Sequence, residues 1–130
     1  MQAAAMDYDL HDTALIDADK LTELKSLLPP ENWAAMQHSM FAAPAGDVPT
    51  LLGLLQTHAD CAALGDQAHK IKGAALLLGL QRLGTLCALI ERTCRAPADT
   101  AQHLNHASAA TALQAIAAQT QAALATDSVA

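Results

Sequence analysis

Apolar side chains recur at every third or fourth position along most of this chain, and this spacing is typical of helices that bury one face. No segment alternates apolar and polar residues in the way that a half-buried strand does. Alanine and leucine dominate the apolar residues, and aromatic residues make up only 2% of the chain, which favours closely packed helices. The pattern therefore predicts an all-α fold.

Prolines, glycines and capping residues divide this pattern into six predicted helices. Asp17 and Asp47 suit the N-terminal ends of helices, and Pro30 suits a first helical position. The predicted ranges are 17–28, 30–43, 47–59, 60–79, 81–95 and 98–125. Four longer helices with short connections, preceded by shorter ones, predict an antiparallel four-helix bundle with one or two additional short N-terminal helices.

The predicted bundle occupies residues 17–125, a common size for a single domain. We expect residues 1–16 to form an N-terminal arm and residues 126–130 to form a frayed tail. The segment before Met6 resembles an expression tag, and we expect the domain to have been cut from a longer protein.

Charge and hydropathy exclude several classes of partner. The seven basic and thirteen acidic residues give a formal net charge of −6, which repels a polyphosphate backbone, so we expect no nucleic-acid partner. No window approaches the roughly 18 apolar residues of a membrane-spanning helix, so we expect no direct membrane contact. Cys61, Cys87 and Cys94 lie within apolar helical patterns, which favours buried, reduced thiols and a cytoplasmic location.

The fourth predicted helix presents a histidine on its polar face. The apolar stripe of this helix consists of Leu64, Ala68, Ile71, Ala75 and Leu78. His69 lies about 140° from the centre of that stripe on a helical wheel, so its imidazole should face solvent. Lys72 and Gly73 follow His69 at the i+3 and i+4 positions and therefore share its face.

Small residues surround His69 on this predicted face, namely Ala62, Gly65 and Gly73. A glycine inside a helix costs about 1 kcal/mol relative to alanine, so two of them beside one exposed histidine suggest a functional reason. We interpret them as steric clearance that lets a partner protein approach the imidazole. Leu76, one turn beyond Gly73, is a predicted apolar contact for that partner. Lys70 is either a basic contact for an acidic partner or a residue that only keeps the surface soluble.

The exposed imidazole suits phosphoryl transfer. A histidine with an ordinary pKa of about 6.5 is largely neutral near neutral pH, so its nitrogen can attack an acyl phosphate without a strong base. The phosphoramidate product stays reactive, which suits a relay rather than a stable mark. Lys72 supplies a compact cation that suits phosphate oxygens.

The run from Ala68 to Ala75 and Gly79 together resemble the signature of the histidine-containing phosphotransfer (HPt) domain. The likeness is to domains at the C-terminus of bacterial hybrid sensor histidine kinases; it covers residues 15–96 and is strongest over residues 58–91. It implies a four-helix bundle with the phospho-acceptor exposed on the second helix. It also implies that His69 accepts the phosphoryl group, that Lys72 stabilises it, and that Gly73 provides clearance.

The resemblance also implies the partners. They are receiver domains, one in a hybrid sensor kinase and one in a response regulator. No kinase activity is implied, and the sequence has no glycine-rich nucleotide loop. We expect no cofactor, because any Mg²⁺ would be bound by the receiver domain, and we expect a monomer.

Two alternatives compete with this interpretation. His103 and His106 lie three residues apart, with Cys94 not far away in sequence, which is a weak pattern for a metal-binding helical bundle. Alternatively, the chain is a helical adaptor that docks receiver domains without accepting phosphate. The presence of both His69 and Lys72 argues against the adaptor.

Overall fold

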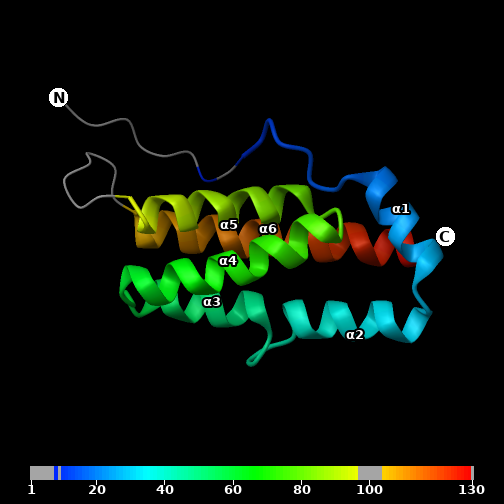
Figure 1. Ribbon diagram of the computed structural model, residues 1–130, viewed down its shortest axis with the longest axis horizontal. Coiled ribbons are helices and arrows are strands. Elements are labelled where there is room, and N and C mark those ends of the chain that lie inside the picture. The colour runs from blue at the N-terminus through cyan, green and yellow to red at the C-terminus, as the bar shows by residue number, and fades with distance from the viewer. Residues whose placement is uncertain (1–7, 9, 97–103, 130) are drawn as a thin grey trace.

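The computed structural model describes residue 8, residues 10–96 and residues 104–129. Across this part of the chain it has α-helices and no strand, as predicted. The helices are α1 (Ala18–Leu27), α2 (Pro30–Phe41), α3 (Asp47–Gln56), α4 (Cys61–Leu77), α5 (Gln81–Cys94) and α6 (His106–Val129) (Figure 1).

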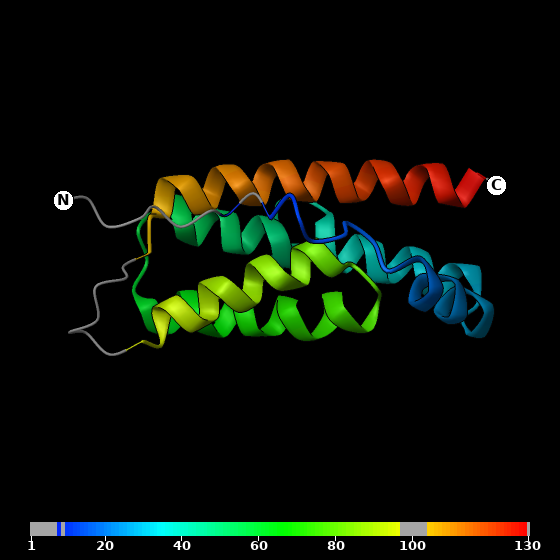
Figure 2. The same ribbon diagram turned by 90° about the horizontal axis from the view of Figure 1, so that it is seen from above.

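Helices α3 to α6 form the four-helix bundle. Each of them packs against the helix before it, and α6 closes the ring against α3. The connections are short from α3 to α5, so successive helices run antiparallel, and α2 extends the line of α3 along the side of the bundle (Figures 1 and 2). The predicted architecture is confirmed, and α4 is the second helix of the bundle.

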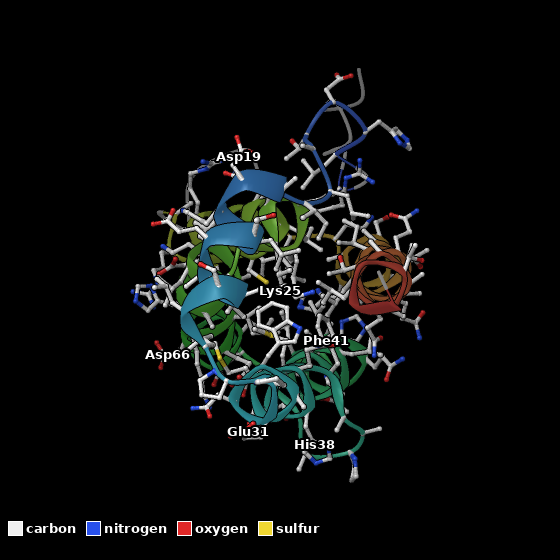
Figure 3. The ribbon with its side chains drawn as sticks, turned by 90° about the vertical axis from the view of Figure 1, so that its right-hand side faces the viewer. Asp19, Lys25, Glu31, His38, Phe41 and Asp66 are labelled. Carbon is white, nitrogen blue, oxygen red and sulfur yellow. The ribbon has the colours of Figure 1, made fainter. Side chains whose placement is uncertain are left out.

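The first helix crosses the end of the bundle where α4 turns into α5. The backbone N–H of Asp17 donates to the carbonyl of Gly79 at 2.7 Å, and Gly79 adopts the left-handed conformation with φ of +80°. A Cβ at Gly79 would lie 2.9 Å from the Asp17 carbonyl oxygen, so glycine permits this close approach. In the last turn of α1, where Figure 3 labels Lys25, its Nζ lies 5.8 Å from the centre of the ring of Trp33, a buried residue of α2.

Helix boundaries agree with the predicted ones to within a few residues, with physical reasons for the differences. Asp17 caps α1, but the residue that caps α3 is Gly46, so Asp47 is the first helical residue and not the predicted cap. Helix α3 ends before His58, which has a φ of +54°. The predicted start of the last helix lies in residues 97–103, outside the described part of the chain. Residues 104 and 105 are not helical, and Asn105 Oδ1 accepts from the backbone N–H of Ser108 at 2.9 Å.

Helix α6 continues to Val129, beyond the predicted end at residue 125. Fraying of residues 126–130 in solution stays a prediction. At the other end of the chain, Tyr8 is buried, and its hydroxyl accepts from the backbone N–H of Asn105 at 3.2 Å. Arg82 Nε donates to the Thr13 carbonyl at 2.9 Å, so this part of the predicted arm packs on the bundle.

The apolar stripe predicted for the fourth helix lies in the core. All five stripe residues of α4 are buried, as are the inward-facing residues of α5 and α6, which are Leu83, Leu86, Cys87, Ile90, Leu113, Ile116 and Leu124. Buried apolar surface of this kind is the main source of stability for an aromatic-poor bundle. No helix in the described residues is long and apolar enough to cross a membrane.

The three cysteines differ in exposure. Cys87 is buried in the core, Cys94 is half-buried, and Cys61 is exposed. The prediction that all three thiols are buried is therefore wrong for Cys61. Cys61 is the first residue of α4, and the first buried residue of that helix is Leu64.

Candidate functional site

His69 projects from the middle of α4 into solvent. Its side chain is 62% exposed, whereas the neighbouring Ala68 and Ile71 are fully buried. Asp60 caps the start of the helix by accepting from the backbone N–H of Ala63 at 2.9 Å. The predicted orientation of the imidazole is confirmed.

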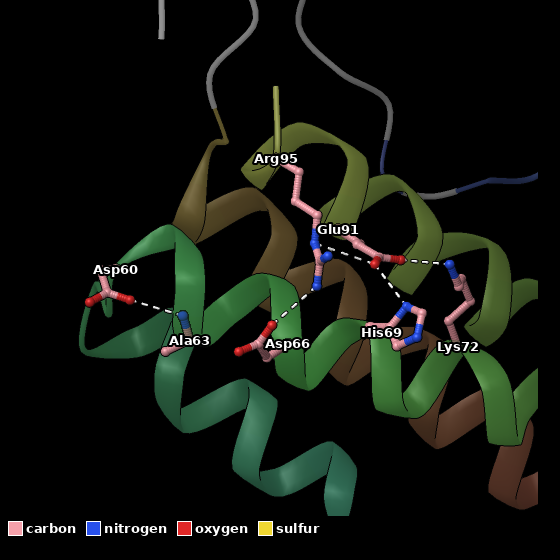
Figure 4. A network of polar contacts seen from close by, with 7 residues as sticks. All are labelled: Asp60, Ala63, Asp66, His69, Lys72, Glu91 and Arg95. Atoms are coloured by element: carbon pink, nitrogen blue, oxygen red, sulfur yellow. Dashed lines mark hydrogen bonds and ion pairs between the residues drawn. The ribbon is translucent and has the colours of Figure 1, made fainter. Parts of the chain in front are cut away.

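Glu91, on the neighbouring helix α5, holds one nitrogen of this imidazole. His69 Nδ1 lies 2.8 Å from Glu91 Oε2, and the Glu91 side chain is only 11% exposed (Figure 4). An ionised carboxylate can only accept hydrogen bonds. Nδ1 of His69 therefore carries a proton and donates a hydrogen bond to Glu91. The other nitrogen, Nε2, then bears the free lone pair, because neutral imidazole has one protonated nitrogen.

Lys72 occupies the second oxygen of the same carboxylate. Its Nζ lies 2.6 Å from Glu91 Oε1, and its side chain is 29% exposed. The hydrogen bond from Lys72 lowers the pKa of Glu91 most strongly, burial opposes it, and the interactions with His69 lower it further. Glu91 therefore stays ionised and keeps the ammonium group of Lys72 beside the imidazole.

Arg95 extends this network by one helical turn. Its Nε lies 3.4 Å from Glu91 Oε2, and one of its terminal nitrogens lies 3.1 Å from Asp66 Oδ1 on α4 (Figure 4). Two cations, Lys72 and Arg95, thus face two carboxylates, Glu91 and Asp66. With a neutral His69 the formal charges of these four side chains cancel.

The predicted clearance residues lie in different environments. A Cβ at Gly73 would meet nothing within 4 Å, and both Gly73 and Ala62 are exposed. Gly65 is buried, and a Cβ there would lie 3.3 Å from Arg95 Nε and 3.7 Å from the Cβ of Cys94. Gly65 therefore lies under the Arg95 side chain and not on the open surface, which corrects the wheel-based prediction.

The predicted docking residues also differ from one another. Leu76 is half-buried against α5, where a Cβ at Gly84 would lie 2.5 Å from Leu76 Cδ2. The apolar side chain that this end of α4 exposes is Leu77, at 62%. Lys70 is exposed and its Nζ pairs with Asp47 Oδ1 at 3.1 Å.

Two residues of the metal-site alternative, Cys94 and His106, lie in the part of the chain that the structure describes. No group of three or more histidine, cysteine, aspartate or glutamate side chains there has the arrangement of a metal site. His103 lies outside the described residues. The ring of His106 lies 4.5 Å from that of His58, in a tilted stack.

Sequence reasoning missed Glu91 and Arg95 as members of the site. The sequence pattern of α5 does indicate that Glu91 is partly buried. Glu91 lies four residues after Cys87 and next to Ile90, at the edge of the apolar stripe of this helix. A carboxylate in that position is rarely buried without a partner. Arg95 follows Glu91 by four residues, the spacing at which helical side chains pair.

Comparison with known proteins gives one finding. A family model described as "Hpt domain" matches residues 17–126 of this chain. Neither the curated proteins nor the solved structures include a match.

Proposed function

The chain belongs to the Hpt domain family, whose members are phosphotransfer modules in phosphorelays, and on that basis we propose that His69 Nε2 is the atom that carries the phosphoryl group. The observation that carries this proposal is the contact between His69 Nδ1 and Glu91. It fixes the tautomer in which Nε2 has the free lone pair, on a side chain that is mostly exposed.

The reaction we propose is transfer from a phosphorylated receiver-domain aspartate. Nε2 attacks the phosphorus in line, the N–P bond forms, and the bond from phosphorus to the aspartyl oxygen breaks, so that the aspartate leaves as a carboxylate. The imidazole ring becomes positively charged while Nδ1 keeps its proton, and Glu91 stabilises that charge. The reverse attack, by the aspartate of a second receiver domain, passes the group on.

Lys72 has the position needed to stabilise the transferred group. Its ammonium group carries three N–H donors, and Glu91 Oε1 accepts only one of them. The remaining donors are available to phosphoryl oxygens on Nε2 of His69, which precedes Lys72 by three residues on the same helix face. Lys72 therefore acts as an electrostatic partner and not as a proton donor or acceptor.

The open surface at Gly73 supports transfer between proteins and not to a small molecule. A receiver domain must bring its aspartate within bonding distance of Nε2, which requires the two protein surfaces to meet around His69. At Gly73 no side chain protrudes from that surface, and nothing lies within 4 Å of where its Cβ would be. We further propose that the donor receiver belongs to a hybrid sensor kinase, that the acceptor receiver belongs to a response regulator, and that any Mg²⁺ is held by the receiver.

A transfer assay tests the proposal. The chain is incubated with a receiver domain that has been phosphorylated with acetyl phosphate or by a hybrid kinase and ATP. We expect acid-labile, alkali-stable phosphate on the wild type, none on His69→Gln, and normal labelling of His38→Gln, which replaces an exposed histidine on α2. An adaptor that only docks receivers would bind the partner and stay unlabelled, and that result would refute the proposal.

A further inference from the structure

Two cysteines meet at the end of the bundle where α4 begins and α5 ends. Cys61 is the first residue of α4, and Cys94 is the last residue of α5. Because the two helices are antiparallel neighbours, the start of one lies beside the end of the other (Figure 1). These thiols take no part in the phosphotransfer chemistry described above.

Gly65 lets the two helices approach closely at this end. A Cβ at Gly65 would lie only 3.7 Å from the Cβ of Cys94, so Cys94 packs onto the backbone of α4 one turn after Cys61. Cys61 precedes Gly65 by four residues and so shares its face of α4, which places the Cys61 side chain next to that of Cys94. A disulfide requires the Cα atoms of its two cysteines to lie close together, and neighbouring helices that approach closely can meet that requirement.

The two thiols differ in access to solvent. Cys61 is exposed and can be reached by a small oxidant, whereas Cys94 is half-buried behind it. Burial, and then the contact with Cys61, raise the pKa of the Cys94 thiol to about 12. The exposed residue is therefore the one that reacts first, and the half-buried residue is placed to resolve the product.

From this juxtaposition we propose that Cys61 and Cys94 form a reversible intramolecular disulfide that fastens α4 to α5 beside the His69 site. The oxidant is a low-molecular-weight disulfide such as glutathione disulfide. The Cys61 thiolate attacks one of its sulfur atoms, forms a mixed disulfide and releases one glutathione thiolate. The Cys94 thiolate then attacks the Cys61 sulfur and releases the second glutathione. Two cysteine thiols are oxidised, glutathione disulfide is reduced to two glutathiones, and the two cysteine protons end on them.

The consequence is a covalent link between the helices that carry His69 and Glu91. His69 lies two turns after Cys61 on α4, and Glu91 lies one turn before Cys94 on α5. A disulfide at this end closes a long loop of chain and so reduces the conformational freedom of the unfolded state. It also opposes separation of α4 from α5 next to the Glu91–His69 hydrogen bond.

The test uses the whole chain, incubated with glutathione disulfide and then quenched with a thiol-alkylating reagent. Intact mass and peptide mapping should show a Cys61–Cys94 link with the mass loss of two hydrogen atoms, and Cys87 alkylated only after unfolding. The midpoint of thermal unfolding should rise by roughly 5 °C or more relative to the reduced chain. Dithiothreitol should reverse both changes.

The double variant Cys61→Ser/Cys94→Ser keeps Cys87 and serves as the matched control, in which glutathione disulfide should change neither mass nor unfolding midpoint. The wild-type result decides the proposal even if this variant folds poorly. Stable glutathione on Cys61 without the internal link would overturn the proposal. So would chain-to-chain dimers through Cys61, or a disulfide that leaves the unfolding midpoint unchanged.

Discussion

Glu91 Oε2 lies 2.8 Å from His69 Nδ1, and this one contact, made between two neighbouring helices, decides which nitrogen of the imidazole is free to react. The same carboxylate holds Lys72 through its other oxygen at 2.6 Å. Glu91 is thus the shared partner of the two residues that the proposed phosphotransfer depends on.

Replacement of Glu91 should shift the tautomer of His69 and slow phosphorylation. In Glu91→Ala nothing at that position accepts from Nδ1, so the neutral ring should populate the Nε2-protonated tautomer, which has no lone pair on Nε2. We expect phosphorylation to slow on the order of ten-fold, in line with loss of a charge-assisted hydrogen bond. Nitrogen-15 NMR of the imidazole reports the tautomer directly. An unchanged tautomer ratio would contradict the role assigned to Glu91, whatever the rate.

Lys72→Ala should slow acceptance of the phosphoryl group by roughly ten-fold or more, because one preorganised cation near the transferred phosphate is lost. Lys72→Arg should retain much of the rate, since a guanidinium can still pair with both Glu91 and phosphate. Lys70→Ala is the matched control: it removes the same charge from the next helical face, where Lys70 pairs with Asp47. If Lys70→Ala slowed transfer equally, the net charge of the surface, and not the position of Lys72, would explain the effect.

A bulky residue at position 73 should block the partner without harming the fold. A Cβ at Gly73 and a Cβ at Gly53 would each meet nothing within 4 Å, and both glycines are helical. Replacement of either with alanine should stabilise the chain by up to about 1 kcal/mol, from helix propensity. Gly73→Gln should slow transfer on the order of ten-fold, through steric interference with the receiver surface, while Gly53→Gln should not. Unaltered transfer by Gly73→Gln would refute the clearance role.

Mild acid should destabilise the bundle through His106 at the start of α6. Burial, and then the neighbouring His58, lower the pKa of His106. As the pH falls, His106 therefore takes up a proton in the unfolded state before it does so in the folded state. The stability that is fully present above the ordinary pKa of 6.5 is lost as the pH drops towards and through the lower pKa of the folded state. His106→Gln should lose less stability than the wild type between about pH 7.5 and pH 5 in urea unfolding. Parallel losses in both proteins would show that His106 is not responsible.

The exposure of His69 and the buried stripe of α4 could be predicted because both depend on local periodicity. A helical wheel needs only the sequence of one helix, and Ile71, Ala75 and His69 all lie where it places them. Helix ends could be predicted from capping residues such as Asp17. The predicted end of the third helix was wrong because His58 has a positive φ, which a helical wheel does not encode.

The partners of His69 could not be predicted in the same way. The contact with Glu91 depends on the register between α4 and α5, which no single-helix pattern encodes. Gly65 was misplaced for a related reason: α4 packs against both α3 and α5, so its buried surface is wider than its apolar stripe. A glycine at the edge of that surface is buried by the Arg95 side chain from the neighbouring helix.

The nitrogen of His69 that bonds to phosphorus can be identified directly. Phosphorus-31 NMR and nitrogen-15 NMR of the chain, phosphorylated by a receiver domain, identify the modified atom. We predict one phosphohistidine, with phosphorus on Nε2 of His69 and a proton retained on Nδ1, which lies 2.8 Å from Glu91 Oε2 in the unmodified chain. Phosphorus on Nδ1, on another side chain, or on no residue of a chain that binds its partner would contradict this prediction.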